Sequence, residues 1–237
     1  KTALLIFRAR SHGEPLTIEL LGEKITESPN EKLLGIIVQS DLKWSNQCDK
    51  MTSDINYALS VLKRLVNHLG QKELKTIADG LINSKIRYAL PVFAGESIRF
   101  CETDPQSSLL RRIQRLQNDA LCIVTGRKRR DHARISEMLQ ATGFLSVNQT
   151  AAYSLMLELW KGREFRVPIL GSLLGKRRND ERTLRSDTTN KQTAVANDTL
   201  SLTCEKLWNM APHKFKTTNL LTVAKMEAKR FVRTLPI

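Results

Sequence analysis

Short apolar runs separated by polar breaks fill the first forty residues. An apolar run covers residues 3–7, residues 16–20 alternate apolar and polar side chains, and residues 33–38 form an apolar run rich in β-branched side chains. Runs of this length and period are typical of β-strands, and Ser28-Pro29-Asn30 interrupts them. Strands this short need a partner surface to be stable. The pattern predicts a small antiparallel β unit.

From Ser45 onward the apolar positions recur every three or four residues, as on amphipathic helices. We expect a long helix that ends at Gly70 and a second helix that Pro91 stops. Asp104-Pro105, a capping residue followed by proline, predicts the opening of a third helix, which ends at Gly126. Further helices are expected at 135–141, at 147–161 with Ser146 as its cap, at 200–209 and at 220–233.

One segment, residues 171–197, has a charge run followed by almost wholly polar residues and lacks apolar periodicity. It is typical of a mobile connection or a surface arm. The sequence therefore predicts an α+β protein that is mostly α. Its expected parts are a β unit over 1–44, a helical body over 45–170, a charged linker over 171–197 and C-terminal helices over 198–237.

Residues 138–157 carry no charged side chain and together have the length of a membrane span. The run contains Gly143, Asn148 and Gln149 and is too polar for lipid, so it predicts two helices broken at Gly143. The four cysteines lie far apart and no secretory signal precedes them. We expect reduced thiols in an intracellular protein of the cytoplasm or nucleus, neither secreted nor membrane-bound.

Motifs for self-contained catalysis are missing from the sequence. The four histidines are isolated, without cysteine or histidine at the spacing of zinc ligands. There is no nucleophile elbow and no glycine-rich phosphate loop. Acidic residues do not occur as a pair placed for two-metal phosphoryl chemistry. The sequence indicates no active site of its own, and an independent hydrolase is the weakest hypothesis.

Basic residues outnumber acidic ones, 38 to 24, and most of the excess of +14 lies after residue 126. A polyanionic partner is favoured, most simply nucleic acid, with a solvated basic surface as the alternative. Cations at 127–130 follow a helix end, where they also favour the helix dipole, but they are denser than capping requires. The candidate contacts to a phosphate backbone are Lys63, Arg64, Arg111, Arg112, Arg115, Arg127, Lys128, Arg129, Arg130 and Arg134.

Tryptophan side chains could also take part by stacking on bases. Trp44, Trp160 and Trp208 each lie within an apolar pattern of a helix or a strand end. Core packing is therefore the favoured interpretation for all three.

Several short motifs follow one another in a distinctive order. They are Lys1-Thr2 with Leu5-Ile6-Phe7, Leu20-Leu21-Gly22-Glu23-Lys24-Ile25, Lys32-Leu33-Leu34-Gly35-Ile36, Asp41-Leu42-Lys43-Trp44-Ser45, Ile86-Arg87-Tyr88-Ala89-Leu90-Pro91-Val92-Phe93, and the segment from Leu116 to Gly126. This order resembles the region after the catalytic hairpin in reverse transcriptases of non-LTR (LINE-type, jockey-like) retrotransposons. The resemblance covers about residues 1–165 well and the rest more loosely.

The resemblance implies a role for each part of the chain. Residues 1–44 would be the end of a polymerase palm, and the helices would form a thumb that clasps the backbone of an RNA/DNA template–primer. By position, Lys1 would lie near the phosphates of the incoming nucleotide, and Leu34-Gly35 would be the primer grip. A glycine within a β-branched strand also permits close backbone approach, although a simple bulge explains Gly35 equally well.

Catalytic carboxylates of that family, including the Tyr-x-Asp-Asp hairpin, do not occur in this sequence. The chain starts at Lys1 inside an apolar run and its first methionine is Met51, so we expect a fragment of an RNA-directed DNA polymerase that is inactive alone. It would hold no cofactor, since Mg²⁺ would belong to the missing catalytic segment, and the rest of the polyprotein would be its partner. The alternative is a helical protein-interaction module with no nucleic-acid role, in which helices at 138–157 and 200–237 bind a protein.

Overall fold

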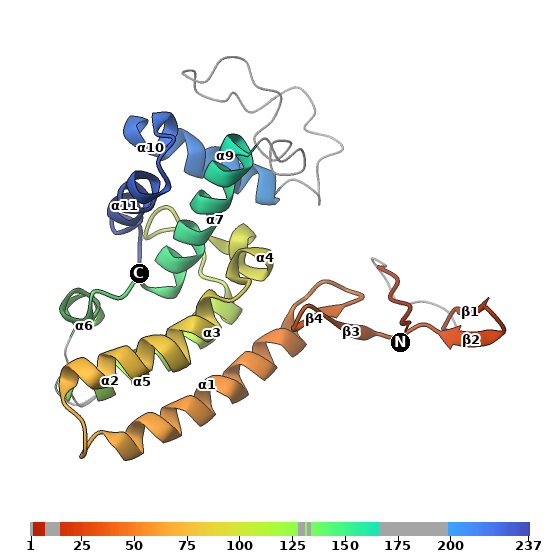
Figure 1. Cartoon of the computed structure of the whole chain (residues 1–237), viewed down its shortest axis with the longest axis horizontal. Helices are drawn as coiled ribbons and strands as arrows, with labels where there is room; N and C mark the ends of the chain where they lie inside the picture. Colours follow the sequence, from red (N-terminus) through yellow and green to blue (C-terminus); the bar gives the residue numbers. More distant parts are fainter. Residues whose placement is uncertain (1, 8–14, 128–130, 132–133, 166–198) are drawn as a thin grey trace. The chain divides into compact units, whose positions relative to one another are not determined.

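A computed structural model describes residues 2–7, 15–127, 131, 134–165 and 199–237 of the chain (Figure 1). Short antiparallel strands lie at its N-terminal end and helices follow, which confirms the expected α+β, mostly α class. The chain divides into two compact units, Lys1–Tyr57 and Ala58–Ile237, and the division falls inside helix α1 (Ser45–Leu65). The expected linker at 171–197 lies outside the described residues.

Two β-hairpins form the strand part of the N-terminal unit. Strand β1 (Thr17–Leu20) pairs antiparallel with β2 (Glu23–Thr26), and β3 (Asn30–Leu33) pairs antiparallel with β4 (Ile36–Gln39). Each hairpin turns on a Leu-Gly pair, Leu21-Gly22 and Leu34-Gly35, in which both residues have positive φ. Positive φ at both central residues defines the type I′ turn, whose twist matches that of the flanking strands.

The expected single strand at 33–38 is wrong, because the chain reverses direction within it. Leu34 has a φ of 48° and Gly35 a φ of 86°. Glycine adopts this left-handed region without steric cost. Gly35 is therefore a turn residue, and it is neither a site of close backbone approach nor a bulge within a strand. The expected strand at 3–7 contributes only an isolated parallel bridge between Leu4 and Glu27.

Side chains of the second hairpin and of α1 satisfy each other's backbone groups. The Gln39 side-chain oxygen accepts hydrogen bonds from the Asn46 backbone N–H (2.8 Å) and from the Ser45 hydroxyl (3.0 Å). The buried Gln47 side chain accepts one from the Ile37 backbone N–H at 2.9 Å. The first N–H groups of a helix have no partner within the helix, so Gln39 completes the start of α1.

Helices build the C-terminal unit, and α7 lies at its centre. After α1 come α2 (Gln71–Ala78), the π-helix η1 (Asp79–Asn83), α3 (Ser84–Arg87), α4 (Leu90–Ala94), the 3₁₀ helix η2 (Gly95–Ser97), α5 (Ser108–Thr125), α6 (Ile135–Thr142), α7 (Val147–Glu164), α9 (Thr199–Met210), α10 (His213–Thr217) and α11 (Leu221–Val232). Helix α7 packs against α3, α4, α5, α9 and α11 (Figure 1). It is buried on most sides, as expected for the central helix of a core.

The predicted helices are confirmed, except for three of their boundaries. The first helix ends at Leu65 and not at Gly70, which is the N-cap of α2. Pro91 does not stop a helix but lies in the first turn of α4, where a missing N–H costs nothing. The preceding helix already ends at Arg87. Asp104 does not cap α5, whose N-cap is Ser107. Its carboxylate instead accepts hydrogen bonds from the Phe100 backbone N–H at 2.7 Å and the Cys101 backbone N–H at 3.0 Å.

A π-helix interrupts the segment from α2 to α3. The buried apolar residues here recur every four positions, at Leu74, Ala78, Ile82 and Ile86. Each step of four residues in a regular α-helix overshoots a full turn by about 40°, so a strict spacing of four drifts away from the core. The wider turn of η1 reduces this drift and keeps both ends of the segment facing the interior.

The uncharged run at 138–157 is divided between α6 and α7, as expected. Gly143 ends α6 with a φ of 70°. Ser146 caps α7 together with the Gln149 side chain, an arrangement that satisfies two backbone N–H groups. In the part of the chain that the structure describes, no helix combines the length and the apolar character needed to cross a membrane.

Candidate nucleic-acid interface

Helix α5 presents arginines outward because its other face is buried. Leu110, Ile113 and Leu121 are at most 3% exposed, and they fix which side of the helix faces the core. The side chains of Arg111, Arg112 and Arg115 are exposed, as the sequence predicted. The Arg111 Nε donates a hydrogen bond to the Gln106 side-chain oxygen at 3.2 Å.

One side of α5 leads from these arginines toward the end of the helix. Arg112, Arg115, Asp119 and Cys122 are spaced by three, four and three residues, which places them on one side of an α-helix. Asp119 and Cys122 line a hollow of about 610 Å³. The arginine side of α5 therefore continues into this hollow.

Two predicted cations from different parts of the chain meet at the same hollow. Lys63 lines it from the last turn of α1, and Arg127 lines it from the residue after the α5 cap, Gly126. We call the surface formed by Arg112, Arg115, Lys63 and Arg127 the α5 basic surface. Cations outnumber carboxylates on it, because Asp119 is the one acidic residue among the described residues that line the hollow.

Arg127 is paired in the structure. Its Nη1 lies 3.1 Å from the Glu137 carboxylate in the first turn of α6, and both side chains are about half exposed. Exposed ion pairs contribute little to stability. The guanidinium can therefore exchange Glu137 for a phosphate, which a guanidinium can bind through two nitrogens.

No other described candidate of the C-terminal unit lines the hollow. Arg64 and Arg134 are exposed, but neither lines the hollow. Leu34 and Gly35 belong to the N-terminal unit, where Leu34 is 82% exposed at the hairpin turn and the Gly35 carbonyl accepts a hydrogen bond from the Lys50 ammonium at 3.3 Å. Four candidates, Lys1, Lys128, Arg129 and Arg130, lie outside the described residues.

The tryptophans pack largely as predicted. Trp160 is 2% exposed and its Nε1 donates to the Thr218 carbonyl at 2.9 Å. Trp208 is 8% exposed and lies edge-on to Phe215, with 6.2 Å between ring centroids. Trp44 is half-buried. Neither Trp160 nor Trp208 is placed to stack on a base.

The four cysteines differ in burial. All four cysteines are free thiols, with Cys48 and Cys204 buried and Cys101 exposed. Burial raises the pKa of the Cys204 thiol to about 12. Among the residues that the structure describes, no group of three or more histidine, cysteine or acidic side chains is arranged to hold a metal ion.

A second set of cations does not stand out in the sequence. Lys75 of α2, Arg87 of α3 and Lys229 of α11 line one pocket, although each stands apart from the basic runs. Only the packing of α11 beside α7 brings Lys229 to the others, and no spacing in the sequence signals it.

Comparison of the chain with protein-family models, curated proteins and solved structures gave no match. The likeness to reverse transcriptases therefore rests on the order of the sequence motifs.

Proposed function

We propose that this chain binds the sugar–phosphate backbone of an RNA/DNA template–primer, as a thumb-like segment of a non-LTR retrotransposon reverse transcriptase. The observation that carries the proposal is the α5 basic surface, where Lys63 and Arg127 line one hollow and the arginines of α5 lead into it. The order of motifs in the sequence supports the same function.

Contacts of this kind bind without reading bases. Flexible, exposed cations neutralise phosphates and release condensed counterions, so affinity depends on salt and not on sequence. Trp160 and Trp208 are buried, so neither offers this surface an aromatic platform for base stacking. The chain therefore binds a duplex at any position along its length, independently of base sequence.

Polymerisation would require a further segment of the polyprotein. That segment would supply the catalytic carboxylates and their Mg²⁺, while this chain would hold the duplex in the cytoplasm or nucleus. Alone, the chain binds a hybrid without extending its primer.

Salt titration of binding to an RNA–DNA hybrid, followed by fluorescence anisotropy, tests the proposal. For R112A/R115A, the slope of log K against log salt should become shallower by about 0.9 for each phosphate that is no longer neutralised, or about 2 in total. The matched control is K72A/K225A, which removes two exposed cations that do not line the hollow. An equal change in both variants would contradict the proposal, and salt-insensitive binding would favour the helical interaction module.

A further inference from the structure

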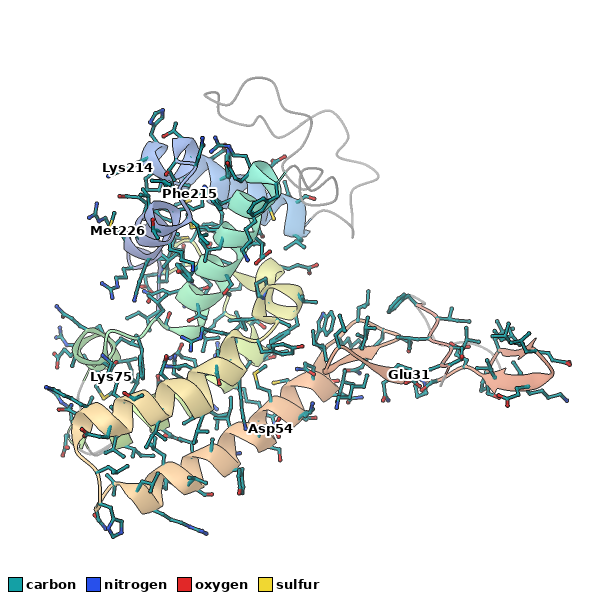
Figure 2. All side chains as sticks on the ribbon, viewed as in Figure 1. Glu31, Asp54, Lys75, Lys214, Phe215 and Met226 are labelled. Atoms are coloured by element: carbon teal, nitrogen blue, oxygen red, sulfur yellow. The ribbon has the colours of Figure 1, made fainter. Side chains whose placement is uncertain are left out.

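A separate pocket of about 430 Å³ lies in the C-terminal unit, within the size range of small-molecule sites. The segment from α2 to α3, the connection between α6 and α7, and helices α7 and α11 all contribute to its lining. Its three cations, Lys75, Arg87 and Lys229, come from three different helices. Figure 2 labels Lys75 on α2, beside α6.

One of these cations is neutralised within the pocket wall. The two terminal nitrogens of the Arg87 guanidinium each donate a hydrogen bond of 3.2 Å to an oxygen of the Asp79 carboxylate. The Asn83 amide also donates to Asp79, at 3.1 Å. Asp79 is the one acidic residue among the described residues that line the pocket. Arg87 therefore compensates the negative charge of Asp79.

The other two cations have no such partner. Lys75 and Lys229 form no ion pair within the described part of the chain, and both are exposed. The pocket therefore carries an excess of two positive charges. Two unpaired ammonium groups that line one pocket attract an anion that binds in it.

A buried hydrogen bond connects the pocket lining to α5. Asn83 is buried, and its side-chain oxygen accepts a hydrogen bond from the buried Gln117 amide at 3.2 Å. This contact ties the π-helix η1 to α5, and π-helices are frequent at functional sites. At the end of α6, a Cβ at Gly143 would lie 4.0 Å from the Lys75 Nζ, so the backbone there comes close to the ammonium.

Uncharged groups in the lining are suited to an anion attached to an organic body. Burial raises the pKa of Tyr153, so its phenol stays protonated and can donate a hydrogen bond. Phe144 and Leu145, which are partly exposed, offer apolar surface in the same pocket. Donors and apolar area together suit an organic anion better than a free metal ion.

We propose that this pocket binds a phosphate monoester through the ammonium groups of Lys75 and Lys229 and the phenol of Tyr153. A phosphate monoester carries a charge of about −1.5 to −2 at neutral pH, which matches the two unpaired ammonium groups better than a single carboxylate does. The phosphate has two possible sources, a small phosphorylated molecule or the terminal phosphate of a nucleic-acid strand. This proposal does not depend on the α5 basic surface.

Isothermal titration of the full chain with adenosine 5′-monophosphate, with adenosine as the phosphate-free control, tests the first source. Each lysine replaced by glutamine removes a charge-assisted hydrogen bond and should weaken binding by about tenfold, so K75Q/K229Q should lose about a hundredfold. The matched control K72Q/K225Q changes one lysine on each of the same two helices outside the pocket and should bind like the wild type.

Oligonucleotides with and without a 5′-phosphate test the second source. A preference for the 5′-phosphorylated strand that disappears in K75Q/K229Q, without binding of the mononucleotide, would assign the pocket to strand ends. Binding of the mononucleotide without a preference for the 5′-phosphorylated strand would assign the pocket to small molecules. If the mononucleotide binds and the 5′-phosphorylated strand is also preferred, the pocket accepts a phosphate from both sources.

The proposal is overturned if neither probe binds through its phosphate, or if K75Q/K229Q and K72Q/K225Q behave alike. R112A/R115A should leave binding of the mononucleotide unchanged, so a failure of the backbone-binding function and a failure of this site are distinguishable.

Discussion

The Asn148 side-chain amide donates a hydrogen bond of 2.9 Å to the Pro236 carbonyl, and both residues are buried. The same amide donates to the Arg99 carbonyl at 3.1 Å, and its oxygen accepts from the Arg99 backbone N–H at 2.8 Å. Gln149 adds a bond from its amide to the Leu235 carbonyl at 3.1 Å. Two neighbouring side chains of α7 thus hold the last residues of the described chain and the segment before α5 against the core.

Replacement of Asn148 by alanine should destabilise the protein strongly. It leaves three buried backbone groups without partners, and the free energy of unfolding should fall by about 3 kcal/mol. Urea denaturation measures this change. The control is Asn219→Ala, because Asn219 is exposed. Equal denaturation midpoints for the two variants would contradict the structural role of Asn148.

Leu34→Asn should stabilise the second hairpin. Leucine at a φ of 48° is strained, whereas asparagine tolerates the left-handed region, so a gain of about 1 kcal/mol is expected. Amide hydrogen exchange of β3 and β4 measures the gain locally. Leu33→Asn, within β3, provides the comparison and should not protect the hairpin. Slower exchange in both variants would point to a cause other than the turn.

Arg127→Ala should separate binding from stability. Arg127 and Glu137 are about half exposed, so the loss of their ion pair should change the free energy of unfolding by less than about 1 kcal/mol. Binding to an RNA–DNA hybrid at low salt should nevertheless weaken. Thermal unfolding and anisotropy, measured on the same preparation, check the two parts. A large loss of stability would assign Arg127 to the fold instead.

Asp104 should make stability depend on pH under acidic conditions. Hydrogen bonds from the Cys101 thiol and from the Phe100 and Cys101 backbone N–H groups lower the pKa of Asp104 from 3.8 to about 2. Because the folded pKa is the lower one, the stabilisation is present above the unfolded pKa and is lost as pH falls from about 4 through about 2.

Asp104→Asn removes this titration, so its melting temperature should fall less than that of the wild type between those pH values. Glu73→Gln, at an exposed carboxylate of α2, should keep the wild-type profile. Identical profiles for Asp104→Asn and the wild type would show that Asp104 does not contribute.

Thiol labelling should distinguish the cysteines by their burial. In the folded protein, iodoacetamide should modify the exposed Cys101 well before Cys204, because the thiolate is the reactive form and burial raises the pKa of Cys204 to about 12. Mass spectrometry of peptides measures the order. In denaturant all four cysteines should react alike, and early modification of Cys204 in the folded state would contradict its placement.

The helical part was largely predictable because local signals mark several of the helix ends. Gly126 and Gly143 end α5 and α6 in the left-handed conformation, and Ser146 begins α7, all as the sequence indicated. Proline and aspartate were less informative, since Pro91 fits the first turn of a helix and Asp104 can cap a loop as readily as a helix.

The hairpin turn and the pocket lined by Lys75 and Lys229 were not predictable in the same way. Leucine rarely adopts positive φ, so the sequence Leu34-Gly35 does not predict a type I′ turn, whereas Asn-Gly would have predicted one. Lys75 and Lys229 meet only through tertiary packing, which leaves no trace in local spacing. Exposure of the α5 arginines was predictable from the buried face opposite them.

The four-residue spacing of buried positions from Leu74 to Ile86 has a genetic consequence. A π-helix holds one residue more than a regular turn, and Gly80 within it is exposed with open space where a side chain would start. Loss of that single codon would make Asp79 and Arg87 seven positions apart, which still places them on one side of a regular helix. Asn83 would then stand three positions from Asp79 and four from Arg87, so all three side chains would stay on one side of the helix and a lineage could gain or lose the π-turn in one step without rebuilding this wall of the pocket.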